Sequence, residues 1–585
     1  MTEDLFGTTM DAFVVSCSSI GEVFLATGAN PGPIPIPLTY DEAVSDPTYG
    51  EKWAEACREE YNGKFLTNQS WVYTQLPAGR HAFKSKWVFK VDYNPDKSVK
   101  RFKARIVGCG YDQRAGEDYI ETFASTLHAD SLRGFLLATN QLDHELTEAD
   151  VIKAFTHATV KEELYMLPPP GFGQGSDVCK LNRTVEGTKQ AAHEFMTLNV
   201  KTIEKEGFIR DLNDPNLFRR EKDGILVLLG VYVDNLLLSS PRGNEAAKKQ
   251  VNEFLGNYGK VIRLELRGQP KVFMGIEIIQ EAEEGRLSLS QKNYITETFH
   301  KCCNASTKQF GTPVAPGQEV GFAQMKGAKV EIENDDGSFS INEAETEKRR
   351  AAMLGKPYKS LMGCLLWILM TRADVYYHTA TLCQHMSDPS TENWDAGIAL
   401  LAYLYATRDL GLIYTRIKGG ETCTIDCYAD SSFRHKGQPK PQAGFCIFVN
   451  KCLVSYSSRK LIITPQSSCE AEIAACCNGA KSTMFVRSVM QFLGLMVKMP
   501  MNVITDNDAA MHAIRNPGTT QRTRHFESWQ MYCRELKLRL LIEIFWIPTA
   551  DMIADIFTKC VDKTTFLRLR SKLVQPVHIL PGNAH

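Results

Sequence analysis

The chain has 585 residues, with 67 Lys and Arg against 68 Asp and Glu and a formal net charge of −1. This length predicts roughly three or four domains. The near-neutral charge excludes a histone-like polycation, so any nucleic-acid binding has to come from local basic surfaces. The 17 cysteines include no C-x-x-C pair, which argues against a disulfide framework and a structural zinc site. No apolar stretch approaches membrane-spanning length, so we expect no membrane partner.

Basic residues alternate along the second of two strands that are predicted within residues 86–108. Arg101, Lys103 and Arg105 are spaced by two, so they share one face of that strand. Two interpretations are open. The strand is either a solvated sheet edge, where charges are common, or a cationic surface for phosphate groups, whose oxygens need fixed cations.

A strand end and a helix are predicted next. Asp150 terminates an alternation of polar and apolar residues and precedes a short helix-like stretch. Residues 180–195 have the spacing of a helix, and this segment carries Gln190.

A carboxylate and an amide form the tip of a predicted β-hairpin. An apolar run at 225–229 leads to Tyr232 and then to the pair Asp234 and Asn235, after which a second apolar run begins. Asp-Asn is an ordinary turn pair, so the hairpin alone does not establish a site.

The last third of the chain places carboxylates at the ends of predicted elements, in the order strand, helix, strand, helix. Alone, any of them is more typical of a helix cap or a surface charge. Together they are the ligands that hard divalent cations need, and two such ions can bind the attacking and leaving oxygens of a phosphodiester. The acids are Asp430, either Glu470 or Glu472 (two apart on one helix, so unable to face the same way), Asp506 and Asp555.

In their order along the chain, several segments resemble the reverse transcriptase and ribonuclease H region of copia-type LTR retrotransposon Pol polyproteins. The Tyr-x-Asp-Asp hairpin of that family matches residues 231–236, with Asn235 at its last position. The resemblance extends from about residue 40 to about residue 561. The other segments that carry it are 86–90, 101–107, 148–155, 163–172, 273–278, 289–295, 427–432, 467–475, 503–507 and 548–559.

This resemblance implies an RNA-directed DNA polymerase that uses two Mg²⁺ ions, with Mn²⁺ as a substitute. It implies that Asp150 and Asp234 are catalytic and hold the metal ions, and that Arg101 contacts nucleic acid. Phe155 would exclude a 2′-hydroxyl and Tyr232 would support the primer end. The implied nucleotide-binding residues are Lys103, Arg105, Phe155, Gln190 and Tyr232.

Departures from the family's pattern predict an impaired polymerase. Asn235 replaces a carboxylate of a site that binds divalent cations. We expect the loss of this carboxylate to lower the polymerisation rate by roughly one to three decades, since each tenfold in rate corresponds to about 1.4 kcal/mol of activation free energy. In the family's Tyr-Gly-Leu-Lys-Gln-Ala-Pro motif, the aromatic, leucine and proline positions are Glu186, Thr188 and Ala192.

For the last third of the chain the resemblance implies a ribonuclease H that also uses two Mg²⁺ ions. Glu472 is preferred to Glu470, because the apolar residues 473–475 match the segment after the family's catalytic Glu. The implied catalytic and metal-binding acids are Asp430, Glu472, Asp506 and Asp555. A further block implies phosphate contacts for Arg522 and Arg524, and either a structural role or hybrid contact for His525.

The expected fold class is α+β and multidomain: a right-hand polymerase with a helical connection, followed by an α/β ribonuclease H-like domain. Expected partners are an RNA template, a DNA primer, RNA–DNA hybrid and deoxynucleoside triphosphates, in a cytoplasmic setting compatible with virus-like particles and nuclear access. One alternative is open, an inactive relic or co-opted nucleic-acid-binding protein. The expected segments are a loosely ordered lead-in (1–39), reverse transcriptase fingers, palm and thumb (40–300), a linker loop (301–348), the helical connection (349–420), the ribonuclease H-like domain (421–561) and a tail (562–585).

Overall fold

The computed structural model describes residues 34–577 apart from short gaps, and these residues form two compact units. The first unit contains residues 34–127 and 146–269, and the second contains residues 128–145 and 270–577. The gaps are residues 94–97, 174, 176, 304–306, 308–310, 316, 335–337, 418–421, 434–439, 463 and 517–526.

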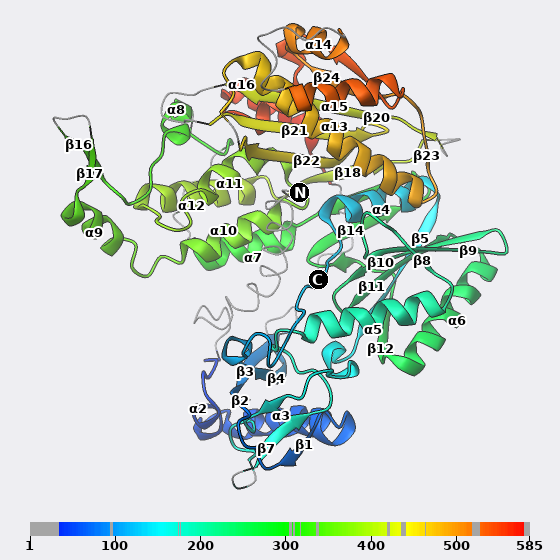
Figure 1. The fold of residues 1–585 in the computed structure, drawn as a ribbon, viewed down its shortest axis with the longest axis vertical. Helices are drawn as coiled ribbons and strands as arrows, with labels where there is room; N and C mark the ends of the chain where they lie inside the picture. The colour runs from blue at the N-terminus through cyan, green and yellow to red at the C-terminus, as the bar shows by residue number, and fades with distance from the viewer. Residues whose placement is uncertain are drawn as a thin grey trace. The chain divides into compact units, whose positions relative to one another are not determined.

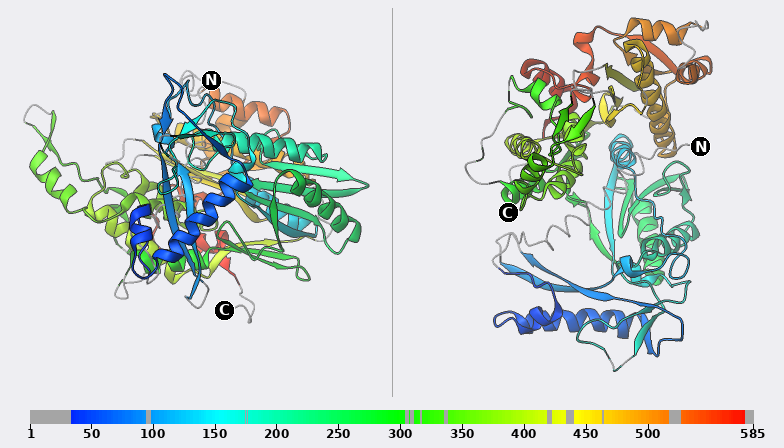
Figure 2. Two further views of the ribbon diagram at one scale, coloured as in Figure 1. Left: turned by 90° about the horizontal axis from the view of Figure 1, so that it is seen from below. Right: turned by 60° about the vertical axis from the view of Figure 1, so that its left-hand side comes forward.

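A long antiparallel hairpin packed on a helix forms one core of the first unit (Figure 2). Its strands are β3 (Ser85–Tyr93) and β4 (Val99–Gly108), which confirms the two predicted strands. Phe102 of β4 packs against Trp53 of α3 (Gly50–Asn62), with ring centroids 4.6 Å apart. This part also contains α2 (Tyr40–Ser45), the π-helical turn Gly63–Thr67, the 3₁₀ turn Gly110–Asp112, and a sheet of β1 (Trp71–Thr74), β7 (Val178–Leu181), β6 (Tyr165–Met166) and β2 (Ala82–Phe83).

A six-stranded sheet in the order β12-β5-β11-β10-β9-β8 forms the other core of this unit (Figure 1). The predicted hairpin is confirmed, with Leu228 opposite Ser239 and Tyr232 opposite Asn235. Two long helices pack their apolar faces into the same core. The elements are β5 (His144–Val151), β8 (Ile209–Arg210), β9 (Leu217–Lys222), β10 (Ile225–Tyr232), β11 (Asn235–Pro241), β12 (Leu264–Gly268), η3 (Ala154–His157), α5 (Ala191–Lys205) and α6 (Glu245–Val261).

The predicted helix over residues 180–195 is wrong for most of its length, since α5 begins only at Ala191. Part of the segment between β7 and α5 lies against the end of β4 instead. There the backbone amide of Gly108 donates to the Glu186 carbonyl at 2.7 Å. Gly187 has a φ of +84°, and a Cβ there would lie 2.4 Å from the Gly108 oxygen. Only glycine accepts both constraints at low cost, so tertiary packing outweighs the local helical pattern.

A five-stranded sheet with two antiparallel and two parallel pairings dominates the end of the second unit. Its order is β22-β21-β20-β24-β25, and the long helix α13 (Ser468–Phe492) crosses one face (Figure 1). A Cβ on Gly479 of α13 would lie 2.8 Å from the Cys427 sulfur, so glycine permits this close approach. The other elements are β20 (Ile425–Ser432), β21 (Gln442–Val449), β22 (Cys452–Lys460), β24 (Met501–Thr505), β25 (Ile542–Trp546), α14 (Asp508–Arg515), α15 (Glu527–Leu538), η6 (Thr549–Asp551), η7 (Ile553–Phe557) and α16 (Lys563–Leu573).

The rest of the second unit is a second sheet with a helical layer. The sheet order is β13-β14-β15-β18-β26. Helix α4 (Ala129–Gln141) joins this unit through Arg133, whose guanidinium donates to the Val454 carbonyl at 2.6 Å. The elements are β13 (Val272–Phe273), β14 (Ile276–Glu281), β15 (Arg286–Ser290), β16 (Glu331–Glu333), β17 (Phe339–Ile341), β18 (Leu410–Thr415), β19 (Thr422–Cys423), β23 (Met496–Val497), β26 (Gln575–Pro576), α7 (Lys292–Cys302), α8 (Glu319–Ala323), α9 (Glu343–Ala351), α10 (Tyr358–Ile368), η4 (Ala373–Val375), α11 (Tyr376–Cys383) and α12 (Thr391–Ala406).

The architecture confirms the expected α+β multidomain class, since separate cores combine antiparallel sheets, a mixed sheet and helical layers. Within the part of the chain that the structure describes, no helix is both long enough and apolar enough to span a bilayer. The boundaries of the six expected segments stay predictions.

Candidate active sites

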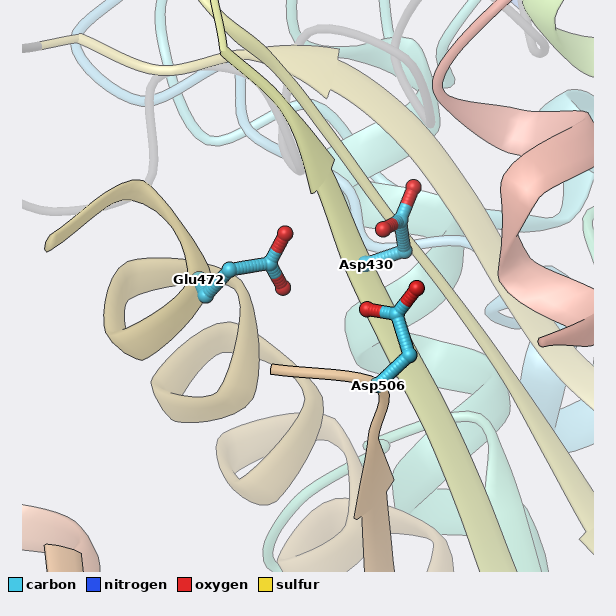
Figure 3. Close-up of side chains that lie close together, drawn as sticks. All are labelled: Asp430, Glu472 and Asp506. Atoms are coloured by element: carbon cyan, nitrogen blue, oxygen red, sulfur yellow. The ribbon is translucent and has the colours of Figure 1, made fainter. Parts of the chain in front are cut away.

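Three of the predicted acids of the second unit converge at one edge of its mixed sheet (Figure 3). Asp430 lies near the end of β20, Asp506 directly follows β24, and Glu472 lies in the second turn of α13. One carboxylate oxygen from each lies within 4.8 Å of the others. Strands β20 and β24 are parallel neighbours, so their carboxyl ends deliver both aspartates to the same edge.

The start of α13 decides which glutamate enters this cluster. Glu470 turns back toward the helix start, where its carboxylate accepts the Gln466 amide at 2.6 Å. Glu472 faces the sheet, and its Oε1 accepts the Ser431 amide at 3.3 Å. The structure therefore places Glu472, rather than Glu470, with the two aspartates.

Asp555 of η7 lies beside this cluster and outside the set of three that shares the 4.8 Å spacing. The next turn connects it to Asp430, because the Thr558 hydroxyl donates to Asp430 Oδ2. Lys559 pairs with Asp555, with Nζ 2.7 Å from Oδ1. Sequence reasoning did not assign a role to Lys559, although its i,i+4 spacing from Asp555 was a usable signal.

Burial and mutual repulsion perturb the acids strongly. Burial, together with the charge of Asp555, raises the pKa of Asp430 to about 7. Burial and the charge of Asp430 also raise the pKa of Glu472 well above its ordinary range. Burial opposes the charge of Lys559, yet Asp430 and Asp555 raise the pKa of this ammonium. Uncompensated buried carboxylates are costly, so the site favours a bound cation.

The donor chemistry of this cluster fits a hard divalent ion. Three carboxylate oxygens converge, and Glu472 Oε2 is buried without a hydrogen-bond partner. Mg²⁺ is bound through such carboxylates, with water and substrate oxygens completing its octahedron.

The two predicted polymerase acids lie close together in the six-stranded sheet and its central hairpin. Asp150 is on β5, and Asp234 is in the β10–β11 turn, where its backbone carbonyl accepts the Val151 amide at 2.8 Å. Val233 has a φ of +52°, which presents the tip in a left-handed turn. The Asn235 amide donates to Asp234 Oδ1 at 3.1 Å.

Arg267 of β12 contacts the other carboxylate of this pair, with Nη2 2.7 Å from Asp150 Oδ2. Burial raises the pKa of Asp150, and the charges of Arg267, Lys103 and Arg105 oppose that rise. The last two residues belong to the β3–β4 hairpin, so their positive charges act at the predicted polymerase carboxylate.

The cationic residues of β4 share one face, as their spacing predicts, opposite the buried Phe102. Two already have acidic partners. Arg101 pairs with Glu59 at 2.8 Å, and Lys103 pairs with Asp92 at 2.6 Å.

The remaining predicted nucleotide residues lie in or near the core. Phe155 packs edge-on against Phe195, and Tyr232 is buried at the end of β10. Gln190 is fully buried, and its amide donates to the Asp118 carbonyl at 2.9 Å. Arg522, Arg524 and His525 lie outside the described residues.

One departure from the family motif has a structural partner. Glu186 pairs with Lys64, which is fully buried in the π-helical turn. Lys64 also contacts Glu60 at 3.1 Å and donates to the Ile106 carbonyl at 2.8 Å. A second cation, Lys153, reaches Glu60 at 3.2 Å. Glu186 is therefore part of an ion network around the fully buried Lys64.

Comparisons with known proteins show what the chain is similar to. The family described as reverse transcriptase (RNA-dependent DNA polymerase) matches residues 68–316. The chain is 27% identical over 542 residues to the Retrovirus-related Pol polyprotein from transposon RE1 of Arabidopsis thaliana, covering 92% of this chain and 34% of that protein. For the polyprotein from transposon TNT 1-94 of Nicotiana tabacum the identity is 26%, with 91% and 38% covered. For the Transposon Ty1-GR1 Gag-Pol polyprotein of Saccharomyces cerevisiae it is 25%, with 93% and 30% covered.

Solved structures show weaker likeness. A foamy viral protease-reverse transcriptase bound to double-stranded DNA has a TM-score of 0.44 and 10% identity, covering 85% of this chain and 69% of that one. LC11-RNase H1 in complex with RNA/DNA hybrid has a TM-score of 0.18 and 15% identity, covering 23% of this chain and 94% of that one. The chain spans about a third of the length of the curated relatives. Over more than nine tenths of its length the chain is therefore similar to Pol polyproteins of copia-type retrotransposons, and residues 68–316 match the reverse transcriptase family.

Proposed function

We propose that this chain is the polymerase and nuclease part of a retrotransposon Pol protein, in which RNA–DNA hybrid cleavage is retained and RNA-directed DNA synthesis is impaired. The carboxylate cluster of Asp430, Glu472 and Asp506 carries the proposal, with its oxygens within 4.8 Å of one another. The nuclease acids are all present, whereas the polymerase hairpin has an amide at Asn235.

In the proposed nuclease, Asp430, Glu472, Asp506 and Asp555 hold Mg²⁺, or Mn²⁺ in its place. When bound, two such ions activate the attacking water and stabilise the leaving oxygen of the phosphodiester. The protein's part is to keep the carboxylates in position before substrate arrives. The Ser431 amide orients Glu472, the Thr558 hydroxyl orients Asp430, and Lys559 orients Asp555. A 2′-hydroxyl distinguishes the RNA strand of a hybrid from DNA.

In the proposed polymerase, Asp150 and Asp234 are the remaining acids, and the outward face of β4 binds phosphate groups of the template and of deoxynucleoside triphosphates. Lys103 and Arg105 support this role, because their charges act on Asp150. One charge is missing at the hairpin tip, so the expected deficit is roughly one to three decades in rate. We propose a cytoplasmic setting for this chemistry, with an RNA template and a DNA primer.

The alternative, a relic that binds nucleic acid without turnover, is favoured for the polymerase half by Asn235 and by the ion pair at Asp150. Two assays on the full chain, each with Mg²⁺ and with Mn²⁺, separate the alternatives. One follows primer extension on RNA and the other follows cleavage of RNA–DNA hybrid. Cleavage that is lost in Asp506→Asn and kept in Glu470→Gln supports the proposal. Hybrid binding with no turnover in either assay supports the relic.

A further inference from the structure

A cation on a bulged strand lies beside the predicted polymerase carboxylates. Strand β12 pairs with β5, and the register advances by two residues from Leu266 to Gly268 while β5 advances by one. Arg267 is therefore the extra residue, and Gly268 accepts the turn with a φ of +77°. Bulges re-aim a side chain and increase local twist. From this position the long side chain reaches both Asp150 and Glu148 on the neighbouring strand.

The Arg267 guanidinium joins two acids of the neighbouring strand. Nη2 lies 2.7 Å from Asp150 Oδ2, and Nη1 lies 3.4 Å from Glu148 Oε1. The Glu148 side chain is 6% exposed and that of Asp150 is 22% exposed. Burial disfavours the charged form of both carboxylates, so a cation close to them is strongly favoured. The guanidinium supplies this partner in a fork geometry that suits carboxylates.

The other polymerase acid also faces a donor of the protein itself, since the Asn235 amide donates to Asp234 Oδ1 at 3.1 Å. Compared with the family's hairpin, this site has one carboxylate fewer. Among the described residues, Asp150 and Asp234 belong to no group of three metal-ligating side chains with close ligand atoms. The arrangement does not fit a pair of divalent ions.

We infer that Arg267 is an internal counter-ion: it neutralises the Asp150 carboxylate as a bound divalent cation would, and it thereby lowers the metal affinity of the polymerase site. The inference rests on the proposed function, which identifies this hairpin as the polymerase site. It adds a second, independent cause of impairment: Asn235 removes a ligand charge, and Arg267 neutralises one that remains. Restoring the acid by Asn235→Asp alone therefore recovers only part of the metal affinity.

Metal binding is the direct test. Mn²⁺ is titrated into the full chain and free Mn²⁺ is followed by electron paramagnetic resonance. Asp430→Asn and Asp506→Asn are present throughout to weaken the nuclease cluster. In this background we compare three single variants, Arg267→Gln, Arg267→Lys and Asn235→Asp. We also measure the double variant that combines Arg267→Gln and Asn235→Asp. Lys248→Gln is the matched control, since it removes a cation from an exposed ion pair on α6.

Arg267→Gln should tighten Mn²⁺ binding by about tenfold, the effect of removing one half-exposed charge from a carboxylate at hydrogen-bond distance. Arg267→Lys keeps the charge and should bind Mn²⁺ as the parent does. The double variant should bind most tightly, and Lys248→Gln should not change. Unchanged or weaker Mn²⁺ binding in Arg267→Gln, with the far-ultraviolet circular dichroism spectrum intact, would overturn the inference.

A second readout separates this inference from the proposed function. Primer extension is measured on the same variants in the natural nuclease background. If Mn²⁺ binding tightens and extension stays absent, Arg267 is a counter-ion in a site that is not a polymerase, and only the proposed function fails. If extension is robust and Mn²⁺ affinity is indifferent to Arg267, only the inference fails.

Discussion

Replacing the buried Asp430 by Asn should abolish hybrid cleavage and, at the same time, stabilise the metal-free protein at neutral and alkaline pH. The side chains have almost the same shape, and Asn still offers an oxygen to the Thr558 hydroxyl that donates to Asp430. The substitution therefore removes a buried negative charge with little change in packing.

The magnitude comes from the pKa of Asp430, which burial and Asp555 raise from 3.8 to about 7. The folded protein holds this proton more tightly than the unfolded chain does. The contribution of this proton to the free energy of unfolding is therefore fully present below pH 3.8 and is lost as the pH rises through about 7. At about 1.4 kcal/mol per pKa unit the full difference is about 4 kcal/mol. The charges of Asp555 and Lys559 interact with that of Asp430, so removing it does not recover the whole difference. We expect the free energy of unfolding to rise by about 1–4 kcal/mol in the Asn variant.

The assay is backbone hydrogen exchange of β20 and α13 in excess chelator between pH 5 and pH 9, after correction for intrinsic exchange. This readout reports on the nuclease sheet, whereas global unfolding of a multidomain chain is not two-state. Protection in the natural protein should fall as the pH rises, and protection in Asp430→Asn should fall less steeply, because only Glu472 then remains as a deeply buried titrating acid of the three. Added Mg²⁺ should restore protection in the natural protein more than in the variant.

Asp426→Asn is the matched control, since Asp426 lies four residues earlier on the same strand and outside the carboxylate cluster. Its exchange profile should keep the pH dependence of the natural protein. If Asp430→Asn is less protected than the natural protein at pH 8 without metal, the reasoning from buried charge is refuted.

Three other predictions concern the first unit. Asn235→Asp should raise primer extension by about tenfold or more at low Mg²⁺, and equal rates for the two forms would contradict the missing-ligand explanation. Lys103→Gln or Arg105→Gln should raise the KM for nucleotide and flatten the salt dependence of template binding, and unchanged values on both counts would assign this face to a solvated strand. Lys64→Met should destabilise the β3–β4 core by about 3–5 kcal/mol, because it leaves the partly buried Glu186 without this cation and leaves Glu60 with Lys153 alone. Backbone hydrogen exchange of β3 and β4 would show this loss, and the double variant with Glu186→Gln should be less affected than the sum of the single changes.

Local patterns in the sequence determined much of the site chemistry. The hairpin with Asp234 at its tip is predicted by two apolar runs around a turn pair. The positions of Asp430 and Asp506 are predicted by apolar strands that end in a carboxylate. These features depend on residues that are neighbours in the chain, so periodicity and turn chemistry are enough to predict them.

Only the tertiary structure decided which residues from distant segments meet. Arg267 reaches Asp150 across 117 positions because β12 pairs with β5, and sequence spacing does not report this pairing. Glu186 departs from the family motif, but its buried partner Lys64 lies 122 positions away. Residues 182–190 have a helical pattern, but Asn182 and Thr184 bond to Ser70 and Ala158, and the segment then passes the end of β4. These tertiary hydrogen bonds and the left-handed Gly187 outweigh local propensity. Charge pairing and packing are contacts in space, so only the folded chain shows which carboxylates have partners.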